Sequence, residues 1–551
     1  MAETTDLIVE CFESSGIETV FGFPCEQMDP YYSSLSDSSI RHVLVRSEAS
    51  AALMADGYAR ASGRIGVVDG VGGPGAAYIG AGLCEADGAS SPVLALTGGN
   101  DRPIRGREVI QDGDNEGILA PHTDMTFDAE SGPRAVEAVE SAVRQMTSGV
   151  PGPAHVNLPG DVLDDDVEVE LGNTDARYPS TRPAPERERI EEIIGLLEAA
   201  ERPIVLAGEG VIRAGASEEL AGFAERTNTP VVTSVNGKGA VPETEPYAVG
   251  TVGRWGFCEP ANDALEAADL VVGLGTRFGD LTTVGWTLIA DETDVVHVDL
   301  DPAWLGRNCD PTVAVLADIR ETLQELSRTI DPGKFAARDE RIETLATERD
   351  AWREDHAEEL TSEDSPVKPH RIIEELNRAI PEDGVLVSAT SFAGFFSAAF
   401  YEVDRPGFGY IQARGSDGIN ACLPQALGVQ VARPDETVVA LTGDGGIGYH
   451  IADLETAVRE DLPVTVVVLN NDGLGSSKAS QMATDAFDLS TDFAEGVDYA
   501  QIARGFGCQA TRVDDPARFV ERLQQAVDSD EPALLDVQID PYALPPIIVE
   551  N

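Results

Sequence analysis

The sequence predicts an α/β protein of three doubly wound domains, each a parallel β-sheet with helices on both faces. Two observations lead to this prediction. Short apolar runs alternate with helical stretches over most of the 551 residues, which is typical of βα units. Two polar segments, one containing several prolines and one highly charged, divide the pattern into three blocks, each long enough to form its own sheet.

The first block predicts a domain at residues 1–165. Its apolar runs at Ile40–Val45, Gly66–Val71 and Val93–Thr97 are each followed by glycine or polar residues, as expected of strands. From Asp164 to Arg189, an acidic run and three X-Pro pairs replace the alternation. We expect this segment to be a linker that crosses the surface.

The other two blocks repeat the pattern and predict domains at residues 185–332 and 368–545. The charged segment Asp331–Pro369 between them is expected to be a second linker, helical at Phe335–Glu359. The strands expected in these two domains are Pro203–Ala207, Pro230–Ser234, Leu270–Leu274, Val295–Asp299, Val385–Ser388, Thr437–Leu441, Val464–Leu469 and Ala533–Gln538.

The charge of the chain excludes some classes of partner. There are 97 acidic and 39 basic residues, a net charge of −58, and only four lysines. A broad basic surface for nucleic acid or anionic lipid cannot be assembled from this set, so we expect neither partner. Acidic residues spread evenly over a chain with a normal apolar fraction are typical of a halophilic protein from a salt-rich cytoplasm.

Cysteine usage and hydropathy predict a cytoplasmic location. The seven cysteines are scattered, odd in number and without a CxxC pair, which suggests neither a zinc site nor a disulfide framework. The longest apolar runs, such as Val464–Leu469, are far shorter than the roughly 20 residues that a membrane span requires. Met1–Phe12 has no basic region, so no export signal is expected.

The clearest chemical motif follows two strands of the third block. Gly443-Asp444-Gly445-Gly446 follows one expected strand, and Asn470-Asn471-Asp472-Gly473 follows the next. A carboxylate, an amide oxygen and a backbone carbonyl are hard ligands suited to Mg²⁺, and a helix expected to begin near Ile447 would direct its positive end at a diphosphate. Ordinary glycine-rich turns are the alternative interpretation.

These two segments resemble the thiamine diphosphate signature of the acetolactate synthase, pyruvate oxidase and benzoylformate decarboxylase family. The resemblance implies that Asp444, Asn471 and the carbonyl of Gly473 hold Mg²⁺ against the diphosphate of thiamine diphosphate. It also implies cofactor contacts in the third domain at Ser391, Gly443, Gly445 and Gly446.

A second part of the resemblance is the start of the pyrimidine-binding domain, which Val45–Glu48 and Ala55–Arg60 match. It implies that the carboxylate of Glu48 contacts the aminopyrimidine ring and activates the cofactor. The alternative is an ordinary glutamate in the first turn of a helix.

Three further segments are placed near the reacting atoms by the same resemblance. Gly73, Pro74 and Gly75 would face the cofactor with backbone amides available for negative charge, the alternative being a plain tight turn. Gln111 would be a catalytic side chain. His122 would cover the substrate, although an isolated surface histidine is an equal alternative.

The resemblance also addresses the shape of the cofactor and a further ligand. Ile419 would hold thiamine diphosphate in its bent form, whereas core packing within a helix is the alternative. Ala207–Gly210 and Gly273–Asp280 resemble strand ends that hold FAD in acetolactate synthases, and bound FAD is left open.

The implied activity is thiamine diphosphate- and Mg²⁺-dependent decarboxylation and carboligation of a 2-oxo acid, with acetolactate and CO₂ from pyruvate as the leading example. Active sites would lie between the first domain of one subunit and the third of another, in a homodimer or homotetramer. The alternatives are a simple 2-oxo acid decarboxylase, another carboligase, or a non-catalytic cofactor-binding homologue. The choice of 2-oxo acid is left open.

Because salt screens the repulsion among 97 acidic residues, we expect the folded protein to be least stable in dilute buffer. Thermal unfolding should shift to higher temperature between dilute buffer and molar KCl. The control is sucrose at the same osmolarity as the KCl solution. A melting curve independent of KCl would contradict the prediction.

Overall fold

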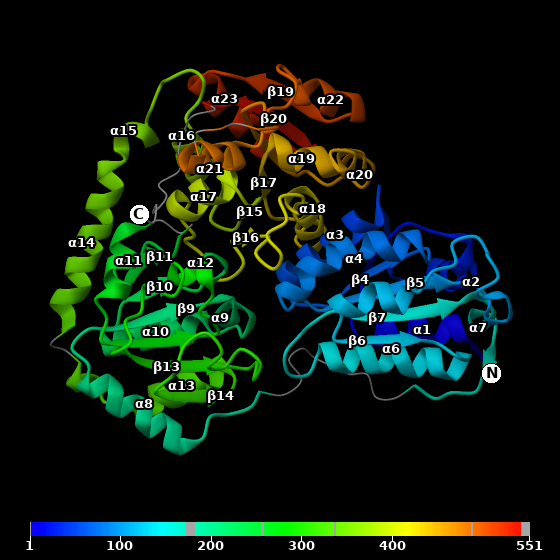
Figure 1. The fold of residues 1–551 in the computed structure, drawn as a ribbon, viewed down its shortest axis with the longest axis horizontal. Helices are drawn as coiled ribbons and strands as arrows, with labels where there is room; N and C mark the ends of the chain where they lie inside the picture. Colours follow the sequence, from blue (N-terminus) through cyan, green and yellow to red (C-terminus); the bar gives the residue numbers. More distant parts are fainter. Residues whose placement is uncertain are drawn as a thin grey trace.

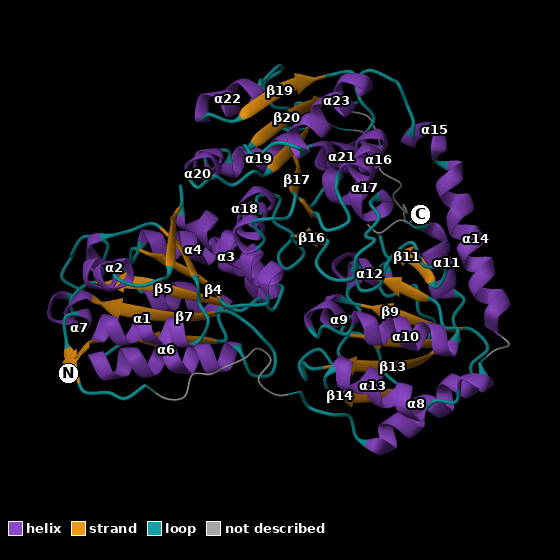
Figure 2. Ribbon diagram, turned by 180° about the vertical axis from the view of Figure 1, so that it is seen from behind, coloured by secondary structure: helices purple, strands orange, loops and turns teal. Residues whose placement is uncertain are grey.

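The computed structural model describes residues 2–171, 182–254, 258–335, 338–485, 487 and 489–540. It contains three six-stranded parallel sheets flanked by helices (Figure 1, Figure 2), which confirms the predicted fold class. Every strand expected from the sequence is present, with ends shifted by a few residues at most. A short antiparallel pair, β1 (Ala2–Glu3) with β8 (Asp166–Val167), joins the two ends of the first block.

The first sheet has the order β3-β2-β4-β5-β7-β6, with all neighbours parallel. Helices α1 and α6 cover one face, and α3 and α4 cover the other (Figure 1). The strands are β2 Thr19–Gly22, β3 Arg41–Leu44, β4 Gly66–Gly70, β5 Val93–Gly99, β6 Met125–Asp128 and β7 Ala154–Pro159. The helices are α1 Thr4–Ser14, α2 Asp29–Ser36, α3 Glu48–Ser62, α4 Pro74–Gly88, α5 Asn115–Leu119, α6 Gly132–Met146 and α7 Gly160–Leu163.

The central sheet has the order β11-β10-β9-β12-β13-β14, the strand order of dinucleotide-binding folds. Its strands are β9 Pro203–Ala207, β10 Val231–Thr233, β11 Ala248–Thr251, β12 Leu270–Leu274, β13 Asp294–Asp299 and β14 Val313–Leu316. Its helices are α8 Arg187–Ala199, α9 Glu209–Arg213, α10 Ser217–Thr227, α11 Glu259–Glu266, α12 Asp280–Thr283 and α13 Ile319–Thr329.

The third sheet, β16-β15-β17-β18-β20-β19, repeats the connectivity of the first. Its strands are β15 Val385–Ser388, β16 Tyr410–Gln412, β17 Val438–Gly443, β18 Thr465–Asn470, β19 Gln509–Val513 and β20 Ala533–Gln538. Its helices are α16 Pro369–Ala379, α17 Phe392–Phe400, α18 Cys422–Ala432, α19 Asp444–His450, α20 Asp453–Arg459, α21 Gly475–Asp485, α22 Tyr499–Phe506 and α23 Pro516–Val527.

The two linkers differ in structure. Residues 172–181 of the first expected linker lie outside the described part of the chain, as do residues 541–545 of the third predicted domain. The second linker contains α14 (Asp339–Asp355) and α15 (Ala357–Leu360), which confirms its predicted helical middle. In Figure 1, α14 runs along the edge of the molecule from the central sheet toward the third.

Helix α3 connects the first and third sheets because it is buried almost all round and packs against α18. Two glycines permit the close approach. A Cβ built on Gly57 would lie 2.3 Å from the carbonyl oxygen of Gln425, and one on Gly428 would lie 2.0 Å from that of Met54. Any larger side chain at either glycine would push the helices apart. None of the described helices has the length and apolar character needed to cross a bilayer.

Candidate active site

The carboxyl ends of β15 and β17 form a small pocket at the point where the strand order of the third sheet reverses, which is where open α/β sheets bind ligands. The pocket has a volume of about 50 Å³. All its described lining residues come from the third segment of the chain. They include every cofactor residue expected there, namely Ser391, Ile419, Gly443, Asp444, Gly445, Gly446, Asn471 and Gly473. We call it the diphosphate pocket.

Asp444 is the buried charge of this pocket. Helix α19 begins at Asp444, not near Ile447 as expected, so the carboxylate occupies the first position of the helix. Its two oxygens accept hydrogen bonds from the backbone N–H groups of Gly445 and Gly473, both at 2.9 Å. Burial nevertheless raises the pKa of Asp444 to about 7. A cation would offset that burial, because positive charge favours the ionised carboxylate.

Asn471 completes a group of three polar atoms. Its amide nitrogen, when turned inward, donates to the carbonyl oxygen of Gly473 at 2.8 Å and to Oδ1 of Asp444 at 3.3 Å. Turning the amide by a half rotation puts its oxygen in the same place. Three oxygens, one each from Asp444, Asn471 and Gly473, would then face one point.

This set of three oxygens fits a small hard cation such as Mg²⁺, which takes oxygen ligands and completes its shell with water and phosphate. It contains a single carboxylate. The described residues hold no group of three or more His, Cys, Asp or Glu side chains that could bind a metal, so no soft or all-carboxylate site competes with it. The predicted ligands are thus brought together, and their role as ligands stays a prediction.

Glu48 lies at the other candidate site, beside the first sheet. Helix α3 begins at Glu48, and the hydroxyl of Ser47 caps it by accepting the N–H of Ser50 at 3.2 Å. Glu48 is therefore a first-turn glutamate, but only 8% of it is exposed. A Cβ built on Gly75 would lie 2.9 Å from its Oε1, so the carboxylate lies directly against the Gly72–Gly75 turn. An ordinary surface glutamate would point to solvent instead.

The Gly72–Gly75 turn is held by two side-chain amides that the sequence analysis missed. The N–H of Gly72 donates to Oε1 of Gln27 at 3.1 Å, and that of Gly73 donates to Oδ1 of Asn115 at 2.7 Å. The N–H of Gly73 therefore already has a partner in this structure, and Pro74 has no N–H to offer. The expected contact of this turn with a developing negative charge stays a prediction. The turn permits close approach, since Gly73 has a φ of +63°.

Gln111 lies beside the Gly72–Gly75 turn, whereas His122 lies near Asp87. The backbone of Gln111 packs on the turn, because a Cβ on Gly73 would lie 2.9 Å from its carbonyl oxygen. Gln111 is exposed and has a φ of +58°. His122 is half-buried, and Nδ1 lies 3.9 Å from Oδ2 of Asp87. No recorded contact joins His122 to Glu48 or to the turn in the described part of the chain.

A buried polar cluster joins the helix that carries Glu48 to the helix that carries Asp444. Ser50 of α3 lies 2.9 Å from Nδ1 of His450, the last residue of α19, and donates a hydrogen bond to Asp453. The N–H of Arg46 also donates to Asp453 at 3.3 Å. Burial lowers the pKa of His450 to about 4 and raises that of Asp453 to about 6, so a neutral imidazole is favoured at neutral pH.

Ile419 is half-buried and lies before α18, not within it. The alternative of helix core packing is therefore wrong. A Cβ on Gly446 would lie 2.6 Å from the Ile419 carbonyl oxygen, so the segment packs closely against α19. Thr390, Phe392, Leu474 and Gly475 also line the pocket and were not found from the sequence.

Three family models match this chain in the order of its three sheets. Residues 2–118 match the thiamine pyrophosphate enzyme N-terminal TPP binding domain, residues 190–326 the central domain, and residues 392–537 the C-terminal TPP binding domain. Relatives agree over nearly the full length. A probable acetolactate synthase large subunit of Methanocaldococcus jannaschii is 31% identical over 98% of this chain and 93% of its own.

The chain belongs to the thiamine pyrophosphate enzyme family. Other similar members of the family differ in name. The acetolactate synthase isozyme 3 large subunit of Escherichia coli K12 is 30% identical over 98% of this chain and 95% of its own. A glyoxylate carboligase of Escherichia coli O157:H7 is 31% identical over 95% of this chain and 90% of its own.

In this thiamine pyrophosphate enzyme, the two candidate half-sites suit the two ends of the cofactor. The diphosphate pocket offers glycines, a helix N-terminus and the oxygen trio, which suit a diphosphate with its cation. The buried carboxylate of Glu48 suits a hydrogen bond with the uncharged aminopyrimidine ring of the cofactor. Both ends of the cofactor therefore find fitting chemistry in this chain.

Replacing Asp444 by Asn should weaken binding of Mg²⁺ and thiamine diphosphate together by at least about 10-fold, because a ligand charge is lost. Isothermal titration of the cofactor, with and without Mg²⁺, would measure this loss. Asp435→Asn is the matched control, since Asp435 is exposed in the turn before β17 and lies outside the diphosphate pocket. Equal affinity in the wild type and Asp444→Asn would remove Asp444 from the metal site.

Proposed function

We propose that this chain is a thiamine diphosphate- and Mg²⁺-dependent 2-oxo acid decarboxylase and carboligase of the cytoplasm, with acetolactate and CO₂ from two pyruvates as its leading reaction. The observation that carries the proposal is the oxygen trio of Asp444, Asn471 and Gly473 in a chain that also keeps a buried Glu48. A non-catalytic homologue would have no need to retain either.

Thiamine diphosphate, when bound, supplies the carbon nucleophile for the 2-oxo acid and accepts the electron pair left by loss of CO₂. Glu48 can hold or accept a proton at its carboxylate, and Gly75 lets that carboxylate lie close against the turn. Asp444, Asn471 and Gly473 would hold Mg²⁺. Ile419, Phe392 and Leu474 give the diphosphate pocket apolar walls that exclude water.

A second copy of the chain should complete each site. The diphosphate pocket takes no described residue from the first segment, and about 50 Å³ is too small for more than part of a cofactor. Apolar side chains are exposed beside both half-sites: Tyr78 on α4 is 57% exposed, Tyr449 on α19 67%, and Ile110 79%. Exposed apolar side chains beside functional groups favour a protein interface.

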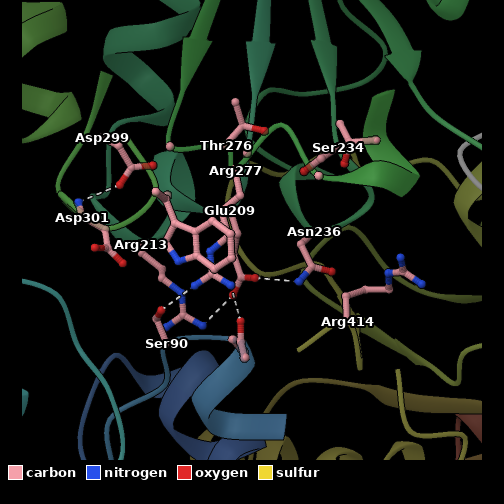
Figure 3. Close-up of a pocket in the computed structure, with 18 of the residues that line it drawn as sticks. Ser90, Glu209, Arg213, Ser234, Asn236, Thr276, Arg277, Asp299, Asp301 and Arg414 are labelled. Atoms are coloured by element: carbon pink, nitrogen blue, oxygen red, sulfur yellow. Dashed lines mark hydrogen bonds and ion pairs between the residues drawn. The ribbon is translucent and has the colours of Figure 1, made fainter. Parts of the chain in front are cut away.

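The central pocket is a candidate nucleotide site, and FAD is the ligand we propose to test. It has a volume of about 450 Å³ and lies at the carboxyl ends of β9 and β12, where the order of the central sheet reverses. Arg213 and Arg277 supply positive charge for phosphate, and Asp299, the last residue of β13, offers a carboxylate that could accept a ribose hydroxyl (Figure 3). Burial raises the pKa of Asp299 to about 6.

The relative named glyoxylate carboligase is as similar to this chain as the acetolactate synthases are. Purified protein in molar KCl with Mg²⁺ and thiamine diphosphate should release CO₂ from one of a panel of 2-oxo acids. Acetolactate from pyruvate supports the leading reaction, another carboligation product supports the second candidate, and a free aldehyde indicates simple decarboxylation.

Replacing Glu48 by Gln should lower turnover by about 100-fold or more while cofactor affinity stays near that of the wild type, because Gln keeps the shape and loses the proton-accepting charge. Product release and cofactor titration would be measured on the same sample. Glu10→Gln, on the exposed side of α1, is the matched control. Unchanged turnover in Glu48→Gln would refute its role.

Mixed oligomers test whether the sites lie between subunits. Doubly tagged dimers of one Glu48→Gln chain and one Asp444→Asn chain should keep about half of the wild-type activity, because one of the two sites retains both residues. A wild-type chain paired with a chain carrying both substitutions should be inactive. The opposite pattern would show that each chain forms its site alone.

A further inference from the structure

One short segment, Arg414–Ile419, lines two different pockets, and we call it the bridging segment. Arg414 and Asp417 line the central pocket, and Ile419 lines the diphosphate pocket. Thr390, which also lines the diphosphate pocket, donates from its hydroxyl to the carbonyl oxygen of Asp417 at 3.2 Å. In Figure 3, Arg414 lies beside Asn236, across the central pocket from Asp299 and Asp301.

The shape of the bridging segment depends on an ion pair that faces the central pocket. Nη1 of Arg414 lies 2.5 Å from Oδ1 of Asp417. The Arg414 side chain is only 10% exposed, and Asp417 has a φ of +59°, a left-handed conformation that aspartate adopts more readily than most non-glycine residues. The side chains that fix the segment are therefore those that a ligand in the central pocket would touch.

A second set of contacts joins the same segment to the central pocket through Glu85 of α4 and Arg60 of α3. The carboxylate of Glu85 accepts the N–H groups of Gly415 and Ser416 at 2.9 and 2.7 Å. Arg60 donates to Glu85 at 2.9 Å and lies 4.0 Å from the carboxylate of Glu209. Glu209 lines the central pocket, where the amide of Asn236 donates to it at 2.8 Å. Arg60 and Glu85 are 3% and 1% exposed.

The bridging segment contacts both pockets, so a change in its mobility at one pocket would reach the other. A ligand that fills the central pocket would exclude water from Arg414 and Asp417 and restrict the motion of the bridging segment. Ile419 would then already be in place when the diphosphate pocket is loaded. The first ligand bears the entropic cost of ordering the bridging segment. The second ligand then binds more tightly, because this cost no longer opposes its binding.

We propose that the bridging segment couples the two pockets, so that a nucleotide in the central pocket tightens the binding of thiamine diphosphate in the diphosphate pocket. The proposal rests on the proposed function for the identity of both ligands. Coupling between binding sites is reciprocal, so thiamine diphosphate with Mg²⁺ must tighten nucleotide binding by the same factor.

The first test is a pair of titrations on the full-length wild type in molar KCl. Thiamine diphosphate with Mg²⁺ is titrated into protein that is free of nucleotide, saturated with FAD, or saturated with ADP. We expect a gain in cofactor affinity of at least about 5-fold in one nucleotide-bound form, with the same factor in the reverse titration. Equal or weaker cofactor affinity with bound nucleotide would overturn the coupling.

The second test needs no nucleotide. Arg414 lies outside the diphosphate pocket, and Arg414→Gln removes its ion pair with Asp417. The variant should bind thiamine diphosphate about 5-fold more weakly than the wild type in nucleotide-free protein. Asp301→Asn is the control, because Asp301 lines the central pocket without a recorded contact to the bridging segment. Far-ultraviolet circular dichroism checks that both variants fold. Unchanged cofactor affinity in Arg414→Gln would also overturn the coupling.

The two tests separate the failure of this proposal from that of the function. If neither FAD nor ADP binds the wild type while thiamine diphosphate does, the nucleotide site and the coupling are both wrong and the proposed function stands. If thiamine diphosphate does not bind the wild type, the proposed function is wrong and the coupling falls with it.

Discussion

The contact between α3 and α18 is the constraint on which both half-sites depend. Helix α3 presents Glu48 at its first turn, and α18 follows directly after the segment that carries Ile419. The two helices approach closely only because Gly57 and Gly428 lack side chains. The amide of Gln425 in α18 donates to Asp56 in α3 at 2.7 Å, so polar as well as steric contacts set their register.

Buried charge reinforces this contact. Arg60 donates to Asp56 at 3.1 Å and to Glu85 at 2.9 Å, and all three are almost inaccessible to solvent. Removing one partner from such a group costs about 3–5 kcal/mol, because an uncompensated charge remains inside. The interface between the first and third sheets is therefore tolerant of neither bulk nor loss of charge, unlike the acidic surface around it.

The sequence was sufficient for the architecture and for the most local parts of the site. Short continuous apolar runs located the strands, since parallel strands that are buried on both faces have this pattern. The start of α19 was misplaced because Gly445 and Gly446 disfavour a helix, whereas the close approach of the Ile419 carbonyl requires a small residue at Gly446. The role of Glu48 depended on resemblance, because a first-turn glutamate has no distinctive pattern of its own.

Other features could not be found from sequence because they depend on contacts between distant residues. Gln27 and Asn115 meet the Gly72–Gly75 turn from 45 and 42 residues away, and no spacing rule predicts such pairs. The cluster of Ser50, His450 and Asp453 joins residues about 400 positions apart. The orientation of the two helices that brings them together follows from tertiary packing alone.

The amide of Asn471 gives the diphosphate pocket two complete bonding arrangements. With its nitrogen inward, it satisfies the oxygens of Gly473 and Asp444 by hydrogen bonds, so these oxygens do not repel one another when no cation is bound. With its oxygen inward, the same three groups would present three oxygens to a cation. Loading then requires one side-chain rotation and no rebuilding of the loop.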